Sequence, residues 1–376
     1  MPPRDSDDDR TPLERSIDNY LRTRTDSYAR SARSELDRWR GWLDARGYDA
    51  GTLDERGDEV MRQYAQRLAE RVDAGGLAAS TATTYWAYLS AFLSYAVRDS
   101  LLDRNPALAE RATEELPDDT TDRTAQQFWS DEQRRRIVEY TRDRAYDAVD
   151  ERGFDALAER RDHALVCVLA YSGVRGAEVL RHPDDDRRGR DGLRWADVDL
   201  NRGVMQVLGK SQRWEPALLP DRAADPLGQW RRVQRPASED WPVFPTDHAP
   251  SKYGALHEGL ADSEGVDAGA VLDDEDVDAA LREYDVAPPA LTTEGARSLM
   301  RRLTDAAGID VDHEAGYLTL HGARRGLGDT IYRRDRGQAQ DVLRHQSLST
   351  TRDAYQHVDA EEQADRLSGL LDDVEE

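Results

Sequence analysis

Apolar residues recur at helical spacing through the first third of the chain. They fall into three sets, namely Leu36, Trp39 and Leu43; Val60, Tyr64 and Leu68; and Tyr85, Leu89, Phe92 and Ala96. Because residues three or four apart share one face of an α-helix, each set predicts an amphipathic helix. The first third is therefore expected to form a small helical bundle.

A polar stretch follows this helical region. The pair Asn105-Pro106 ends the last helical pattern, and residues 114–124, EELPDDTTDRT, have the Pro, Asp and Thr content of a linker. We therefore expect a helical N-terminal domain at residues 13–112, a linker at 113–124 and a second domain at 125–376.

The second domain combines helical and strand-like patterns. A capping-box pattern from Ser130 to Gln133 precedes a helix, and a further helix is expected around Arg161 to Tyr171. Three short segments, LRWADVDL, GVMQVL and WEPALL, predict a small antiparallel sheet because turn signals separate them. The acidic stretch at residues 254–289 is interpreted as a loop-like surface insertion. The predicted fold class is mostly α with a small antiparallel β-sheet.

Composition changes this picture in two ways. The chain has 376 residues and a net charge of −24, and only two of its basic side chains, Lys210 and Lys252, are lysines. Abundant carboxylates with arginine in place of lysine are what we expect of a halophilic protein, and overall acidity does not exclude local arginine clusters that bind phosphate. The single Cys167 excludes an internal disulfide and a cysteine metal site. With no apolar run of membrane-spanning length and no signal peptide at its start, the protein is expected to be cytoplasmic.

Two familiar motifs fail on inspection. The segment from Gly203 to Ser211 ends like a phosphate-binding loop, but it has five intervening residues where four are needed, and those five favour a strand. His313-Glu314 lacks the second histidine of a zinc hydrolase. We therefore expect neither a nucleotide-binding loop nor a catalytic zinc.

Side chains suited to phosphate chemistry occur in order through the second domain. They are Arg175 with Glu178 three residues later, Lys210 at a predicted hairpin turn, His321 and Arg324 on one helix face, and then His345 and Tyr355. Arginine pairs with phosphate oxygens, lysine can act as a proton donor, and a tyrosine hydroxyl can attack phosphorus. Taken singly, each also has an ordinary structural interpretation, such as an Arg–Glu pair or a packed tyrosine.

Taken in order, these residues resemble the Arg, Lys, His-x-x-Arg, His/Trp, Tyr constellation of the tyrosine recombinases, or phage integrases. The surrounding segments SGVRGAEVL, VLGKSQRWEPALLP and RHQSLSTTRDAYQHV are similar to the family's boxes as well. Two differences stand out: Arg344 takes the place of the family's usual glycine, and Tyr355 comes one residue later after His345 than is commonest. The resemblance implies an N-terminal core-binding domain and an α+β catalytic domain.

The resemblance also implies a reaction. Tyr355 would attack a DNA phosphodiester to form a 3′-phosphotyrosyl link, Arg175 and Arg324 would clamp the phosphate, and Lys210 would protonate the leaving 5′-oxygen. His321 would assist proton transfer, His345 would hydrogen-bond the phosphate and Glu178 would support Arg175. Neither a metal nor another cofactor is implied. The expected partner is double-stranded DNA bound by a tetramer. A non-catalytic DNA-binding relative and a type IB topoisomerase-like enzyme stay open as alternatives.

Overall fold

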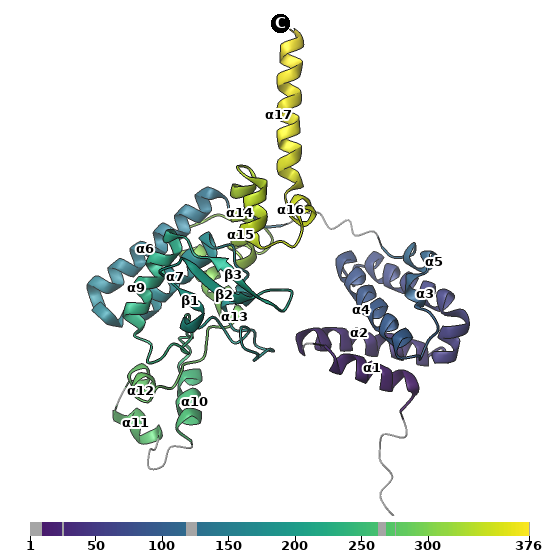
Figure 1. Ribbon diagram of the computed structural model, residues 1–376, viewed down its shortest axis with the longest axis horizontal. Coiled ribbons are helices and arrows are strands. Elements are labelled where there is room, and N and C mark those ends of the chain that lie inside the picture. The colour runs from purple at the N-terminus through teal and green to yellow at the C-terminus, as the bar shows by residue number, and fades with distance from the viewer. Residues whose placement is uncertain (1–9, 25, 118–125, 262–267, 275, 376) are drawn as a thin grey trace, which may run out of the picture. The chain divides into compact units, whose positions relative to one another are not determined.

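The computed structural model describes residues 10–24, 26–117, 126–261, 268–274 and 276–375 (Figure 1). The chain divides into two compact units, residues 1–123 and 124–376. Residues 118–124 of the expected linker lie outside the described residues.

Unit 1 is a helical bundle. Its helices are α1 (Pro12–Arg22), α2 (Asp26–Asp44), α3 (Ala50–Asp73), α4 (Ala79–Arg98) and α5 (Glu110–Thr113), with a 3₁₀ turn at Pro106–Leu108. Thr11 and Asp49 close capping boxes that start α1 and α3. The apolar sets predicted from the sequence line its core, apart from Tyr85, which is only partly buried.

Unit 2 is built mainly of helices around α7, which packs against α6, α9 and α14. Its helices are α6 (Asp131–Arg152), α7 (Leu157–Tyr171), α8 (Gly176–Val179), α9 (Asp221–Gln234), α10 (Ala249–Leu260), α11 (Ala268–Asp274), α12 (Val277–Glu283), α13 (Thr293–Ala306), α14 (Leu320–Tyr332), α15 (Arg336–Leu343), α16 (Leu348–Ala354) and α17 (Gln356–Glu375). The predicted capping box of Ser130 and Gln133 is present and starts α6. Ten successive residues of α7, from Arg161 to Ala170, are buried, because other elements surround this helix.

One antiparallel sheet, in the order β1-β2-β3, lies beside these helices in Figure 1. Its strands are β1 (Val198–Asp199), β2 (Val204–Leu208) and β3 (Trp214–Leu218), and Val207 pairs with Glu215. The prediction of a strand over the whole segment LRWADVDL is wrong. Trp195–Asp197 forms a 3₁₀ turn because the Trp195 indole is buried and donates a hydrogen bond to Gln234 Oε1 at 2.7 Å.

The acidic stretch at 254–289 is not loop-like where the structure describes it. It contains the end of α10 together with α11 and α12. Leu256 and Leu281 belong to the hydrophobic core of unit 2, and the buried Lys252 pairs with Asp278 at 2.8 Å. The abundance of acidic residues in this sequence made the few apolar residues that anchor these helices hard to recognise.

The mostly helical fold with a small antiparallel sheet confirms the predicted fold class. Among the helices that the structure describes, none is both long and apolar enough to span a bilayer.

Candidate functional site

A cavity of about 390 Å³ lies where three separate segments of unit 2 meet. The segments are the start of α8, the turn between β2 and β3, and the connection between α15 and α16. Three cations, Arg175, Lys210 and Arg344, line it together with one carboxylate, Glu215, and with His345. Ser211, Gln346 and Thr350 add neutral polar groups. In a chain of charge −24, this excess of positive charge indicates an anion-binding site.

Arg175 is held in place by Glu178. Its backbone N–H donates to Glu178 Oε2 at 2.8 Å and its Nη1 donates to Glu178 Oε1 at 2.8 Å, across the first turn of α8. Arg344 also donates to Glu178 Oε2. Burial opposes ionisation of Glu178, but Arg344 and Arg175 outweigh it and hold its pKa below the usual value. One buried carboxylate thus orients two guanidinium groups.

The loop before α8 needs a glycine. Gly173 has φ of +65°, and a Cβ there would lie 3.3 Å from both the Val342 side chain and its carbonyl oxygen. Absence of a side chain lets the end of α7 approach the end of α15, which brings Arg175 close to Arg344 and His345.

Lys210 extends from the turn between β2 and β3, and its side chain is exposed. The turn itself is fixed, because Gly209 N–H donates to the Arg213 carbonyl and Gly209 carbonyl accepts from Arg190 Nη2, both at 2.8 Å. A lysine at this position combines a firmly placed backbone with a mobile ammonium group.

Arg324 lies on α14 beside the cavity, not in its lining. Its side chain is buried, and its two Nη atoms donate to the main-chain carbonyls of Gly173 and Leu343. Burial and the nearby positive charge of Arg175 lower the pKa of Arg324 to about 9. No carboxylate accepts a hydrogen bond from this guanidinium among the described residues.

His321, one turn earlier on α14, is exposed and also lies outside the lining of the cavity. Desolvation on its packed side, followed by repulsion from Arg325 and Arg324, lowers its pKa to about 4. The imidazole is therefore neutral at pH 7.

His345 faces the cavity directly. Its Nδ1 is 2.9 Å from Thr351 Oγ1 of α16, which fixes the ring. Burial, together with the charges of Arg324, Arg175 and Arg344, lowers the pKa of His345 to about 4. Like His321, this ring is neutral at pH 7.

Tyr355 is placed differently from the other candidate residues. It is only 2% exposed, belongs to a small apolar cluster with Tyr332 and Val358, and does not line the cavity. Its hydroxyl donates a long hydrogen bond of 3.5 Å to the Arg325 carbonyl, and it packs against Gly328, where a Cβ would lie 1.8 Å from the hydroxyl oxygen. Burial raises the pKa of Tyr355 to about 12, although the charge of Arg324 opposes this shift.

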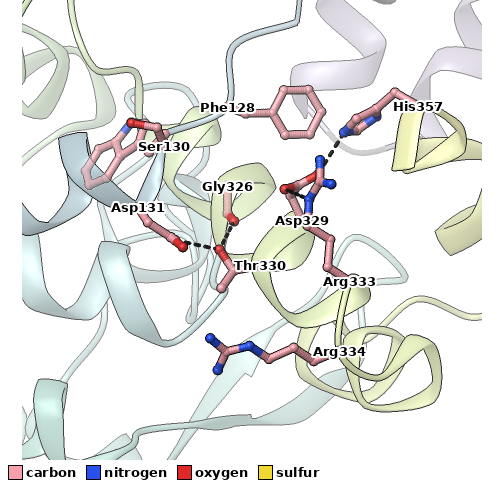
Figure 2. A pocket seen from close by; sticks show the side chains of 10 residues that line it. Phe128, Ser130, Asp131, Gly326, Asp329, Thr330, Arg333, Arg334 and His357 are labelled. Carbon is pink, nitrogen blue, oxygen red and sulfur yellow. Dashed lines mark hydrogen bonds and ion pairs between the residues drawn. The ribbon is translucent and has the colours of Figure 1, made fainter. Parts of the chain in front are cut away.

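A second cavity, of about 490 Å³, lies between α6, α14 and the start of α17 (Figure 2). Several of its polar groups contact one another: His357 Nε2 and Arg333 Nε lie 2.7 and 2.9 Å from the two carboxylate oxygens of Asp329, and Thr330 donates to Asp131 at 2.8 Å. The Phe128 ring packs against His357. These contacts anchor the start of α17.

The structure adds residues to the site that we did not single out from the sequence. In the sequence, Arg344 stands out only as a departure from the family pattern, and nothing marks Glu215, Ser211 or Thr351. Ser211 donates to Glu215 Oε1 at 2.8 Å, a contact between residues four apart across a hairpin turn that no motif marks. Among the described residues, no group of three or more His, Cys, Asp or Glu side chains is arranged to hold a metal ion.

Known proteins are similar to this chain in sequence over a short stretch and in fold over nearly its whole length. No family model matches the chain. A stretch of 91 residues is 36% identical to tyrosine recombinase XerC of Xanthomonas axonopodis pv. citri (strain 306), and it covers 24% of this chain and 26% of that protein. The match thus spans about a quarter of the relative's length.

Solved structures are similar over nearly the whole chain. XerH site-specific recombinase bound to palindromic difH substrate is 16% identical, with 95% of this chain and 94% of that chain covered and a TM-score of 0.55. The Tn1549 transposon integrase in complex with transposon right end DNA is 13% identical, with 95% and 99% covered and a TM-score of 0.57. The chain has the tyrosine recombinase fold. Both the fold and the XerC-like stretch agree with the resemblance that the sequence motifs carry.

Proposed function

We propose that the protein is a site-specific DNA recombinase that cuts and rejoins DNA through a 3′-phosphotyrosyl intermediate at Tyr355. The observation that carries this proposal is the convergence of Arg175, Lys210 and His345, from three distant segments, on one cationic cavity with Arg324 directly behind it. A backbone phosphate of double-stranded DNA is the anion that fits this cavity. The XerH and Tn1549 proteins, which share the fold, are DNA-bound in the structures compared.

The reaction follows from these side chains. The Tyr355 oxygen attacks phosphorus, the bond from phosphorus to the 5′-oxygen breaks, and the energy of the broken ester is kept in the new phosphotyrosyl bond. Arg175 and Arg324 donate to the non-bridging oxygens and stabilise the negative charge of the transition state. Rejoining is the same step in reverse, with a 5′-hydroxyl as the nucleophile.

Two proton transfers accompany this exchange. His321 assists proton transfer from the tyrosine, and Lys210 gives a proton to the leaving 5′-oxygen. His345, fixed by Thr351, donates a hydrogen bond to the phosphate, while Glu178 keeps Arg175 in position. No step calls for a metal, because arginine supplies the positive charge.

Tyr355 must move before it can react. Its hydroxyl is held against Gly328 and the Arg325 carbonyl, outside the cavity that takes the phosphate. The segment from α16 to the start of α17 carries the tyrosine, so a shift of this segment brings the nucleophile to phosphorus.

The proposed function also implies an oligomeric state and a cellular location. Strand exchange between two duplexes calls for a tetramer on DNA, and α17 offers the exposed Leu367, Leu370 and Leu371 for contacts between subunits. We place the protein in the cytoplasm of a halophile, associated with the nucleoid when bound to DNA, because of its acidic, lysine-poor composition.

A covalent-capture experiment tests the activity. The full chain is incubated with a nicked, random-sequence duplex library, and DNA that stays attached to protein in detergent is sequenced. We expect one enriched sequence, and mass spectrometry should find the phosphate on Tyr355. Tyr355→Phe should bind the enriched DNA and give no adduct, whereas the matched control Tyr317→Phe should behave as the wild type.

The same experiment separates the alternatives. A non-catalytic DNA-binding relative leaves no DNA attached in detergent, and it enriches a sequence only when bound DNA is recovered without detergent. A topoisomerase-like enzyme relaxes supercoiled plasmids that lack the enriched site. An adduct at a tyrosine other than Tyr355 overturns the assignment of the nucleophile.

A further inference from the structure

The proposed chemistry assigns no role to Arg344, one of the three cations that line the cavity. It lies at the end of α15, and its side chain is 9% exposed. One nitrogen, Nη2, donates to Glu178, and Nε lies 3.6 Å from Glu215 Oε2, beyond hydrogen-bonding distance. The Nε and Nη1 atoms are buried, and neither has a hydrogen-bond partner among the residues that the structure describes. Buried donors of this kind are costly unless a ligand satisfies them.

The charges around Arg344 also favour the binding of an anion in the cavity. Glu178 is shared between Arg175 and Arg344, so a single carboxylate faces two guanidinium groups. The other carboxylate, Glu215, is partly engaged by Ser211, and Lys210 adds a third positive charge to the cavity. The neutral His345 does not alter this balance. The two carboxylates Glu178 and Glu215 thus face the three cations Arg175, Arg344 and Lys210, which leaves an excess of positive charge in the cavity.

The backbone at Arg344 is unfavourable for any residue with a side chain. Its φ and ψ of 52° and 46° are left-handed, a conformation that glycine adopts readily. Glycine would adopt this conformation at the helix end at a lower energetic cost than arginine does. The backbone conformation alone therefore gives no reason for an arginine at this position.

The geometry points to Arg344 as a third phosphate-binding arginine, whose Nε and Nη1 donate to a non-bridging oxygen of the phosphodiester in this cavity. This inference rests on the proposed function for the identity of the anion, and on the orphaned donors for the binding itself. Arg344 then contributes to charge stabilisation alongside Arg175 and Arg324, and Glu178 positions two of the three.

Binding of inorganic phosphate provides a first test that needs no target DNA. The thermal unfolding temperature is measured in rising phosphate, at ionic strength held constant with KCl. We expect a saturable rise for the wild type and a loss of most of that rise in Arg344→Gly. Arg235→Gly is the matched control, because Arg235 is another arginine at a helix end with a left-handed φ of 50° and lies outside the cavity. An equal phosphate response in wild type and Arg344→Gly overturns the inference.

Cleavage of the captured DNA provides the second test. Loss of a hydrogen bond to a charged group should slow adduct formation by Arg344→Gly about tenfold or more, with Arg344→Lys in between. A substrate with a methylphosphonate at the scissile position lacks one charged oxygen, so the defect should shrink on it. If Arg344 only supported Glu178, the defect would be the same on both substrates, and the inference would be wrong.

Different results would refute the recombinase proposal and the proposed role of Arg344. If the wild type gives no adduct with any DNA, the recombinase proposal is wrong, and the phosphate titration still decides whether Arg344 binds an anion. If the wild type cuts and Arg344→Gly cuts as fast, the recombinase proposal stands and the role of Arg344 is refuted.

Discussion

Replacing Glu178 with glutamine should destabilise unit 2 strongly, because this carboxylate is buried and accepts three N–H groups. Two come from Arg175, at 2.8 Å each, and one comes from Arg344. Glutamine keeps the shape but removes the charge and turns an NH₂ group toward donors. Breaking a buried ion pair on one side costs about 3–5 kcal/mol. Since the Arg175 side chain is 27% exposed and can be rehydrated, we expect the lower end, about 3 kcal/mol.

Calorimetry of the full chain measures this change. For a unit of this size, about 1 kcal/mol corresponds to about 2–4 °C, so the transition of unit 2 should fall by about 6–12 °C. The matched control is Glu294→Gln, because Glu294 pairs with Arg297 at 2.9 Å on the surface, with side chains 65% and 55% exposed. Exposed pairs contribute little, so this variant should unfold almost as the wild type does.

The pH dependence gives the result that would refute the reasoning. The pKa of Glu178 is lowered on folding, so its contribution is fully present above the usual value of 4.5 and is lost as pH falls through the folded-state pKa. The gap between wild type and Glu178→Gln should therefore be constant near neutral pH and close in acid. A gap no larger than that of Glu294→Gln, or one unchanged in acid, would show that Glu178 does not hold the two arginines by its charge.

Four further predictions concern other residues of unit 2 and the charge of the whole chain. Lys210→Arg should slow cleavage by about 10²-fold or more and regain rate on a substrate with a 5′-bridging sulfur, whereas Lys252→Ala should lower the unfolding temperature and leave cleavage unchanged, because Lys252 is buried against Asp278. With the pKa values of His321 and His345 near 4, the cleavage rate plotted against pH should show no inflection near 6.5, and an inflection there would mean that a histidine titrates at its ordinary value. Gly328→Ala should destabilise the protein by about 1–3 kcal/mol, and Tyr355→Phe should relieve part of that loss in the double variant, as urea unfolding can measure. Specific DNA binding should persist in molar KCl, and binding that is tightest in dilute salt and vanishes above it would contradict the halophilic interpretation.

The sequence was sufficient to predict the elements whose apolar face is strong. Leu36, Trp39 and Leu43 marked α2 correctly because a single face of that helix is buried. The prediction failed for residues 254–289, where a few apolar residues such as Leu256 and Leu281 anchor helices that are otherwise covered with carboxylates. It failed also at Trp195, where a tertiary hydrogen bond to Gln234 decided the local conformation.

The candidate site likewise has a part that the sequence predicts and a part that only tertiary packing reveals. Periodicity and motif order pointed to Arg175, Lys210 and His345, and the structure brings these three to one cavity. Their roles stay predictions until adducts are measured. Nothing in the order of residues could show that Arg344 shares Glu178 with Arg175, because the two arginines are 169 positions apart and meet only through packing. Nor could it show that the Tyr355 hydroxyl lies against Gly328.

In the proposed mechanism, the buried position of Tyr355 sets the order of events on DNA. While its hydroxyl is enclosed by Gly328 and the Arg325 carbonyl, a phosphate can occupy the cavity beside Arg175 without meeting a nucleophile. In that mechanism, encounters with DNA that leave α16 and α17 undisturbed end in dissociation without a strand break. Only a complex that lasts long enough for this segment to rearrange proceeds to a strand break. Residence time on the DNA thus becomes a criterion for selecting the target, in addition to affinity for it.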